Sequence, residues 1–240
     1  MSVDNLQKRL ARRLRWQKQA HQLERSDRML ISHLPGLRAW QSERLANSFA
    51  HFMDDPSKKL AAQFFLSDLY GDADFMQRDE EAAKILPKMT RILPTTLLQA
   101  AVDAIELSVL SHALDMRMAR ALYEMGVKHG RISTEEYQAA YRKIGLKRLR
   151  ERQINLVLEV GERLDSVIKM HGIGKLLAAS RLPARMLGLA HLQGFLERGF
   201  TAFNHLGGAD AFLTEIHQQE SCIARRLRLG QARPFEPPFT

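Results

Sequence analysis

Residues 95–125, TTLLQAAVDAIELSVLSHALDMRMARALYEM, decide the fold class of this chain of 240 residues. Apolar residues recur there with the spacing of an α-helix, and no glycine or proline interrupts them. A second long segment of helical pattern runs from Leu146 to Met170. No part of the chain shows the sustained alternation or the Asn-Gly and Asp-Gly turns that mark strands and hairpins. The sequence therefore predicts an all-α protein with two long central helices.

Glycines, prolines and capping residues divide the chain into about nine or ten helices. We expect residues 33–36, HLPG, to separate the first helix from the second, and Pro183 to open a later helix. Asp55-Pro56 fits an N-cap followed by a proline in the first turn. Ser133 and Glu136 fit a capping box. The other expected boundaries are an end at Tyr70-Gly71, a start at Asp72 or Asp74, a start at Thr95, ends at Gly126, His171–Gly174 and Gly207-Gly208, and a last helix from Asp210 to Leu229.

The pattern predicts one globular multi-helix domain over residues 31–230. A basic amphipathic helix over residues 1–30 precedes it, and a proline-rich tail, residues 231–240, follows it. If the domain has halves, they are residues 31–128 and 131–230. The chain has no repeat of fixed period, which disfavours a solenoid.

Composition favours a soluble protein of the cytoplasm. Hydrophobic residues make up 45% of the chain and charged residues 26%, as in ordinary globular proteins. The single cysteine, Cys222, excludes an intramolecular disulfide, which suits a reducing compartment. We find neither the apolar core of a secretory signal nor an uninterrupted apolar run of the ~20 residues that a transmembrane segment needs.

The chain carries a formal net charge of +9, and two segments together account for more than the whole excess. Residues 1–28 and residues 142–152 each have a net charge of +5. A basic patch of this kind can bind nucleic acid, although such runs are most often solvated helix faces and no known nucleic-acid motif is present. The arginines of the predicted patch are Arg9, Arg12, Arg13, Arg15, Arg148, Arg150 and Arg152.

The first helix has a narrow apolar stripe formed by Val3, Leu6, Leu10 and Leu14, with Trp16 nearby. Three interpretations stay open. The stripe docks on its own domain, it binds a partner helix or an anionic membrane surface, or the helix contacts nucleic acid. A membrane-binding helix would favour a wider apolar face.

Ser108, Ser111, His112 and Asp115 recur at spacings of three and four, so they share one face of the predicted helix. A serine, a histidine and an aspartate on successive turns of one straight helix form a poor catalytic triad, because the nucleophile needs an exposed, strained turn. The ordinary interpretation is a polar seam between helices. The alternative is a buried ligand or metal site.

The sequence predicts no metal site and identifies no cofactor. The carboxylates of Asp103 and Glu106 point away from His112, because nine residues from Asp103 to His112 make 2.5 helical turns. The chain also lacks the Glu-x-x-His pairs of helical di-metal proteins, and one cysteine excludes zinc fingers.

Gly188 and Gly199 are eleven residues apart, which would place them on one face of one helix with Phe195 between them. We expect another helix to approach that face closely. A flat ligand is the alternative occupant, with Phe195 and Phe203 as walls of an internal pocket that also includes Ser108, His112 and Asp115.

Residues 64–79, FFLSDLYGDADFMQRD, combine large apolar residues with many charges around one glycine. The charges predict a partly buried polar network of Asp68, Asp74, Arg78 and Asp79 that fixes a structural corner. The pattern FFLxDLYGxxDFxxRD of this segment, together with RxPAxxxGLxxLQxFLExGFxxF over residues 181–203, resembles an uncharacterised family of bacterial all-helical proteins of unknown function. The resemblance spans about residues 55–220. It implies a bacterial cytosolic helical protein and carries over no catalytic residue.

These observations favour a non-enzymatic helical protein that binds another protein, either a second copy, as a homodimer, or a different partner. One alternative is a ligand-, metal- or cofactor-binding helical protein, including an enzyme, with the internal pocket described above. The other is a nucleic-acid binder that uses the basic helices.

Overall fold

A computed structural model describes residues 3–69, 75–90, 95–128 and 130–237. These residues form ten α-helices and no strand, which confirms the all-α prediction. A short 3-10 helix, Ala50–Met53, precedes α3, and a π-helical segment, Phe65–Leu69, follows it. The α-helices are α1 (Val3–Ser26), α2 (Arg28–Ser48), α3 (Lys59–Phe64), α4 (Phe75–Met89), α5 (Thr95–Glu124), α6 (Thr134–Ile144), α7 (Lys147–Ile168), α8 (Ile173–Met186), α9 (Ala190–Leu206) and α10 (Asp210–Leu229).

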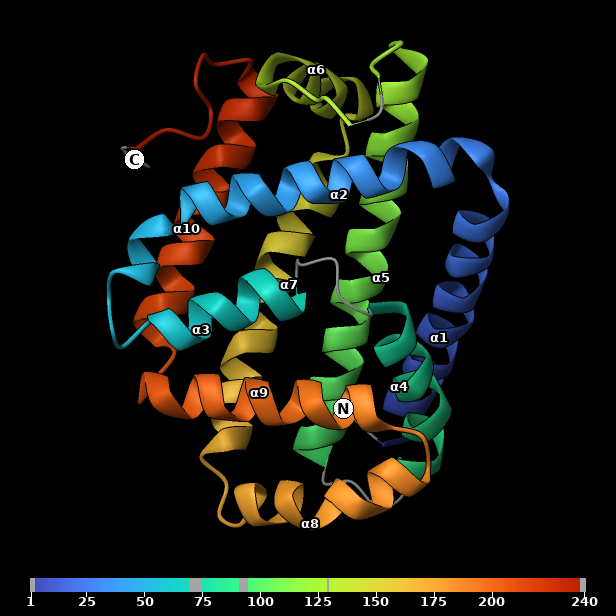
Figure 1. The fold of residues 1–240 in the computed structure, drawn as a ribbon, viewed down its shortest axis with the longest axis vertical. Coiled ribbons are helices and arrows are strands. Elements are labelled where there is room, and N and C mark those ends of the chain that lie inside the picture. Colours follow the sequence, from blue (N-terminus) through green and yellow to red (C-terminus); the bar gives the residue numbers. More distant parts are fainter. Residues whose placement is uncertain (1–2, 70–74, 91–94, 129, 238–240) are drawn as a thin grey trace.

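The helices form two layers that cross steeply (Figure 1). In one layer α1, α5, α7 and α10 run along the long axis of the molecule, and in the other α2, α3 and α9 lie across them. Helix α6 closes one end and α8 the other. The 30-residue α5 is central, because it packs against α1, α2, α6 and α7. The second long helix, α7, packs between α5 and α10.

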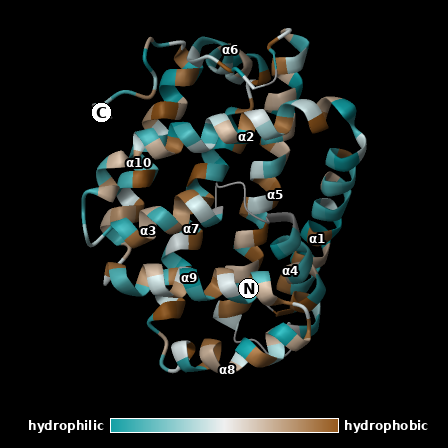
Figure 2. Cartoon of the chain, in the orientation of Figure 1, coloured by the Kyte–Doolittle hydropathy of each residue, from teal (hydrophilic) through white to brown (hydrophobic). Residues whose placement is uncertain are grey.

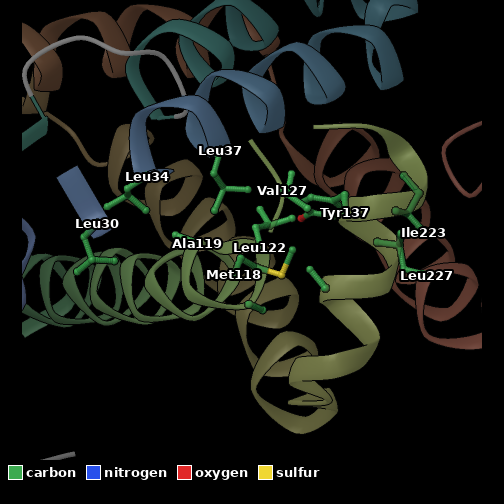
Figure 3. Close-up of a cluster of buried hydrophobic side chains, with 12 residues drawn as sticks. Leu30, Leu34, Leu37, Met118, Ala119, Leu122, Val127, Tyr137, Ile223 and Leu227 are labelled. Carbon is green, nitrogen blue, oxygen red and sulfur yellow. The ribbon is translucent and has the colours of Figure 1, made fainter. Parts of the chain in front are cut away.

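The first core cluster joins α2, α5, α6 and α10 (Figure 3). The Trp40 ring stacks on Tyr137 with their centres 4.2 Å apart, and Phe235 packs edge-on against Trp40 at 5.7 Å. The segment after α10 therefore returns to the core. The buried members of the cluster are Leu30, Leu34, Leu37, Met118, Ala119, Ala121, Leu122, Val127, Tyr137, Ala140, Ile223 and Leu227.

Two further clusters complete the core. The second joins the 3-10 helix, α3, α9 and α10 through aromatic residues that include Phe52, Phe64, Phe203 and Phe212. The third joins α1 to α5 and contains Leu6, Leu10, Leu98, Val102, Ile105 and Val109. The apolar stripe of the first helix therefore docks on its own chain at Leu6 and Leu10, whereas Val3 and Trp16 at its edges are exposed.

The predicted break at residues 33–36 is wrong, because α2 runs through Pro35 without interruption. The first and second helices separate earlier, at Asp27, whose carboxylate accepts hydrogen bonds from the backbone N–H of Met29 and Leu30 at 2.9 and 3.4 Å. Gly36 serves a close contact instead of a break. A Cβ at this position would lie 3.0 Å from the backbone nitrogen of Gly130.

The prediction that Pro183 opens a helix is also wrong. Pro183 lies inside α8, and the boundary is Gly188, whose φ of 67° is the left-handed conformation that glycine adopts easily. Gly188 and Gly199 therefore do not share one helix. At Gly199 another helix does approach closely, since an added Cβ would lie 2.9 Å from Cζ of Phe64 in α3.

Local capping signals predicted helix starts better than prolines predicted helix breaks. The capping box of Ser133 and Glu136 starts α6, and Thr95 begins α5 as expected. The Asp55 carboxylate accepts from Ser57 N at 2.9 Å, but the regular helix begins only at Lys59. The boundaries predicted at Tyr70-Gly71, Asp72 and Asp74 lie outside the described residues. The predicted ends at Gly207 and Leu229 agree with α9 and α10.

Candidate functional site

The polar face of α5 binds side chains from three other helices. Ser108 Oγ donates to Oδ2 of Asp79 in α4 at 3.1 Å, and Ser111 Oγ accepts from the amide of Gln153 in α7 at 2.8 Å. Asp115 Oδ1 accepts from the amide of Gln41 in α2 at 3.2 Å. The three residues thus form part of the polar seam that the spacing predicted. Ser108 bonds to Asp79 and Ser111 to Gln153, so within the described part of the chain neither hydroxyl is hydrogen-bonded to His112.

His112 occupies the junction of α1, α2 and α5. Its Nδ1 lies 2.8 Å from the Arg38 guanidinium, which can only donate, so Nδ1 accepts and Nε2 carries the proton. Burial and the charge of Arg38 lower the pKa of His112 to about 4, although Glu24, 3.5 Å from Nε2, opposes the shift. The His21 ring stands edge-on at 5.5 Å. His112 is therefore neutral at pH 7.

Asp115 has the opposite shift. Burial raises the pKa of the Asp115 carboxyl, and the charges of Arg150 and Arg38 oppose that rise. Gln41, which donates to Asp115, also donates to the Tyr137 hydroxyl at 3.4 Å and so links the carboxyl to the first core cluster.

The structure does not bring the predicted aromatic walls to His112 and Asp115. Phe195 packs against Phe64 with ring centres 5.2 Å apart, and Phe203 lies 6.2 Å from Phe65 in the second core cluster. Asp79 and Arg78 link Ser108 to Phe195, since Asp79 accepts from Ser108 and Arg78 lies over the Phe195 ring. Within the described residues, no contact given above joins either ring to His112 or Asp115. An open hollow of about 690 Å³ in the described part of the chain lies elsewhere, lined by His33, Tyr123, Gly126, Val127, Lys128, Gly130 and Arg131.

The predicted network of the corner exists for the three members that the structure describes. Arg78 pairs with Asp79 Oδ1 at 3.0 Å and donates to the carbonyl oxygen of Asp68 at 2.9 Å. Asp68 in turn accepts from Arg198 of α9 at 2.7 Å, and Asp79 accepts from Gln17 of α1 at 2.7 Å. The Arg78 guanidinium also lies over the Phe195 ring at 4.5 Å, whereas Asp74 is outside the described residues.

A larger ionic cluster, which sequence analysis missed, surrounds Asp103 and Glu106 on the opposite side of α5. The two carboxylates are only 2% and 8% exposed, and four arginines from two helices reach them. From α1, Arg9 lies 3.0 Å and Arg13 lies 3.1 Å from Glu106. From α7, Arg152 lies 3.4 Å from Glu106, and Arg163 lies 2.8 Å from Asp103. We call these six residues the arginine cluster.

The arginine cluster accounts for part of the charge of the two basic segments. Burial alone would raise the pKa of the Glu106 carboxyl, but Arg9 and Arg13 outweigh it and hold the pKa below its usual value. Three arginines of the predicted basic patch, Arg9, Arg13 and Arg152, thus pair with buried carboxylates. Arg150 lies over the Tyr141 ring at 5.2 Å. The exposed members are Arg12, Arg15 and Arg148.

A second buried carboxylate that sequence analysis missed joins α4 to α9. Glu81 is 6% exposed and accepts from the backbone N–H of Leu192 and from Nδ1 of His191, each at 2.8 Å. A carboxylate at a helix N-terminus satisfies free N–H groups and is favoured by the helix dipole. Glu81 therefore caps α9 from another helix, which no local sequence signal could indicate.

The most unusual surface belongs to α8, which lies at one end of the molecule (Figure 1) and carries apolar residues among hydrophilic ones (Figure 2). Only Ala184 of α8 is buried. The helices that α8 packs against most closely are α9 and α7. Leu176, Leu182, Met186 and Leu187, the last just past its end, are 58%, 68%, 80% and 60% exposed. We call these four residues, with the exposed Ala179 and Pro183, the α8 outer face.

Charges beside the α8 outer face are basic. Lys175, Arg181 and Arg185 lie on α8, and residues 166–196 contain no aspartate or glutamate. Arg181 has a partner from the next helix, because its Nε donates to Glu197 at 2.7 Å.

Among the described residues, no group of three or more histidine, cysteine, aspartate or glutamate side chains could hold a metal ion. In the part of the chain that the structure describes, helix α5 is the one helix long and apolar enough to cross a membrane by length and composition, a test that core helices of soluble proteins also pass. Because α5 is surrounded by four helices and carries Asp103 and Glu106 in ion pairs, its surroundings are those of a core helix.

Comparison with known proteins supplies a family. No curated protein and no solved structure matches the chain. A family described as "Domain of unknown function (DUF8198)" matches residues 20–234, which includes every helix from α2 to α10. That span is most of the chain, and it contains both sequence patterns that suggested an uncharacterised helical family. The protein therefore belongs to the DUF8198 family.

Proposed function

We propose that this protein is a non-enzymatic binding protein that docks through the α8 outer face onto an apolar surface edged with negative charge. The observation that carries the proposal is the exposure of four large apolar side chains on adjacent turns at one end of the molecule. Contiguous exposed apolar surface bordered by polar residues is typical of interaction sites.

The polar groups of α5 support binding over catalysis. Ser108, His112 and Asp115 each bond to a side chain of another helix, His112 through Nδ1 alone because its buried Nε2 has no hydrogen-bond partner among the described residues. Hydrogen bonds of this kind between helices fix helix positions.

The basic edge of α8 favours a partner of opposite charge. A second copy of the chain is a poor occupant, because two α8 outer faces would bring Lys175 and Arg185 of each copy together with no acidic residue between residues 166 and 196 to offset them. Like charges across an interface are unfavourable.

The test measures whether the face is covered inside cells. Met186→Cys in a Cys222→Ser background is expected to react with a permeant maleimide at least about tenfold more slowly in cells of the native host than as purified protein. The matched control, Gln218→Cys on the exposed side of α10, is expected to react equally in both settings. Equal reaction of Met186→Cys in cells and in isolation would refute the proposal.

A further inference from the structure

We infer that the occupant of the α8 outer face is the surface of an anionic lipid bilayer, an inference that rests on the docking function proposed above. Helices that lie in a membrane interface combine an apolar face with lysines and arginines and bind more strongly to anionic lipids. The α8 outer face has that composition, with Leu and Met side chains outward and Lys175 and Arg185 beside them.

The apolar residues of the α8 outer face lie on one side of the helix, as binding to a membrane surface requires. At 100° per residue, the six positions of the α8 outer face cover an arc of about 140°. Arg185 lies about 60° beyond one edge of this arc, and Lys175 lies at its N-terminal end. Arg181 lies on the opposite side of the helix, where it pairs with Glu197 of α9. Long basic side chains at such edges can reach lipid phosphates while their methylene stems lie along apolar groups.

The inner side of α8 already fixes the helix, so the outer face is free to bind. Gly174 lets the Phe200 ring approach, since an added Cβ would lie 3.0 Å from its Cζ. Gln193 of α9 donates to the Leu177 carbonyl at 2.8 Å, and Ser180 donates to Gln193 at 3.1 Å. Helix α8 is thus formed and oriented before any membrane is present, and binding does not require the helix to fold.

The shape of the surface favours a bilayer over a protein. Leu182 and Met186 are the most exposed large apolar residues of α8, which lies at one end of the molecule, so a protein partner would need a matching groove with an acidic rim. A bilayer interface supplies acyl chains and phosphates together and adapts to any convex apolar face. The net charge of +9 adds attraction to the negative cytoplasmic leaflet, where each basic residue strengthens binding by about fivefold.

Sedimentation with vesicles tests the inference. The full chain is mixed with sucrose-loaded vesicles of phosphatidylcholine alone or with a quarter phosphatidylglycerol. We expect binding to the anionic vesicles at least about tenfold stronger than to the neutral ones, and weakening in 0.5 M salt, because salt at this concentration screens the charges.

Three variants locate the contact. The double variant Leu182→Ser/Met186→Ser is expected to bind anionic vesicles at least about tenfold more weakly than the wild type. The double variant Lys175→Gln/Arg185→Gln is expected to lose about tenfold or more of the same affinity. Ile31→Ser is the matched control, because Ile31 on α2 is 53% exposed, and its binding should equal that of the wild type. An unchanged circular dichroism melt shows that each variant is folded.

The outcomes separate the two proposals. Absence of binding to anionic vesicles, or binding that Leu182→Ser/Met186→Ser leaves unchanged, overturns the lipid inference. If Met186→Cys is nevertheless protected in cells, the occupant is a protein and the docking function stands. If neither vesicle binding nor protection is observed, both proposals fall.

Discussion

The buried carboxylates of α5 show how single residues join distant parts of the chain. Asp103 and Glu106 lie under guanidinium groups from α1 and α7. Removing one partner of a buried ion pair is costly, because the remaining charges stay desolvated without compensation. In the arginine cluster, substitutions that preserve the shape of a side chain but remove its charge are therefore expected to lower the stability of the protein strongly.

We expect Glu106→Gln to lower the free energy of unfolding by about 2–3 kcal/mol, since Arg9, Arg13 and Arg152 would then face one another. This expected loss of stability is smaller than the loss for a fully buried ion pair, because the Arg9 and Arg13 side chains remain 22% and 32% exposed. Urea denaturation at pH 7 measures the change. The control is Glu159→Gln, which removes a half-exposed partner of Arg152 and should cost under about 1 kcal/mol. A Glu106→Gln protein as stable as the wild type would contradict the assignment.

His112 should make the protein sensitive to mild acid. Its folded pKa of about 4 lies below the usual 6.5, so between these values the unfolded chain binds the extra proton and stability falls as the pH decreases. The wild type should lose on the order of 2 kcal/mol of unfolding free energy between pH 7 and pH 5. His112→Gln, in which the amide oxygen can still accept from Arg38, should lose far less over this range. Identical pH profiles would show that His112 does not carry the dependence.

The residue types of the polar seam could be predicted from the sequence, but their partners could not. The spacing of Ser108, His112 and Asp115 placed them on one face, because spacing within a helix is local. Their partners come from other helices, and in the arginine cluster Arg9 and Glu106 are 97 residues apart. No local pattern encodes such a pairing, so Asp103 and Glu106 were weighed only as metal ligands.

At the scale of helices, glycines mark where two elements meet. Gly161 of α7 faces Leu213 of α10, and a Cβ there would lie only 2.4 Å from Leu213 Cδ2. Leu213 is itself 1% exposed, so it has little room to move. The absent side chain at position 161 therefore sets the spacing between α7 and α10.

Gly161→Ala should destabilise the protein by about 1–2 kcal/mol, because overpacking of the core outweighs the helix propensity that alanine gains. Thermal and urea unfolding measure the effect. Gly194→Ala is the matched control in α9, where an added Cβ meets only Nη1 of Arg198 at 3.0 Å, a nitrogen that does not take part in the pair with Asp68. That variant should be more stable by about 0.5–1 kcal/mol. If both substitutions stabilise, Gly161 is not a packing constraint.

Helix ends could be predicted where the sequence signal is local. The prediction failed where the burial of apolar residues opposed that signal. Ser133 marks the start of α6 because capping depends on neighbouring residues, and α5 starts at Thr95 as predicted. Pro35 was expected to end a helix, since an interior proline costs about 3 kcal/mol. On either side of it, Leu34 and Leu37 are fully buried, and each contributes about 1.5–3 kcal/mol by burial. Tertiary packing therefore keeps α2 continuous.

For the whole molecule, α1 is part of the packed structure. Leu6 and Leu10 are buried against α5, and Arg9 and Arg13 of the same helix supply half of the arginines in the arginine cluster. Helix α1 thus contributes both apolar burial and charge compensation to the central helix.

Removal of residues 1–26 should lower the melting temperature by about 10 °C or more. The loss of Leu6 and Leu10 alone removes about 3–6 kcal/mol of burial, and a domain of this size shifts by about 2–4 °C per kcal/mol. Circular dichroism melts compare the truncated and full chains. A truncated chain that melts at the wild-type temperature would show that α1 is dispensable for the fold.

The all-α class and the central position of α5 could be predicted because composition and periodicity report them directly. The crossing of the two layers could not, since it depends on which faces meet. The α8 outer face was hidden for the same reason. Apolar residues surround much of α8, and only the packed structure shows that Ala184 faces inward while Leu182 and Met186 face solvent.

The docking of α1 on α5 has a consequence for synthesis. Arg9 and Asp103 are 94 residues apart, and a ribosome adds roughly 5–20 residues each second. About 5–20 s therefore pass between translation of the first helix and translation of its binding surface. Throughout that interval Leu6 and Leu10 lack their partners on α5, so the nascent chain exposes apolar residues to chaperones until the middle of the message has been read.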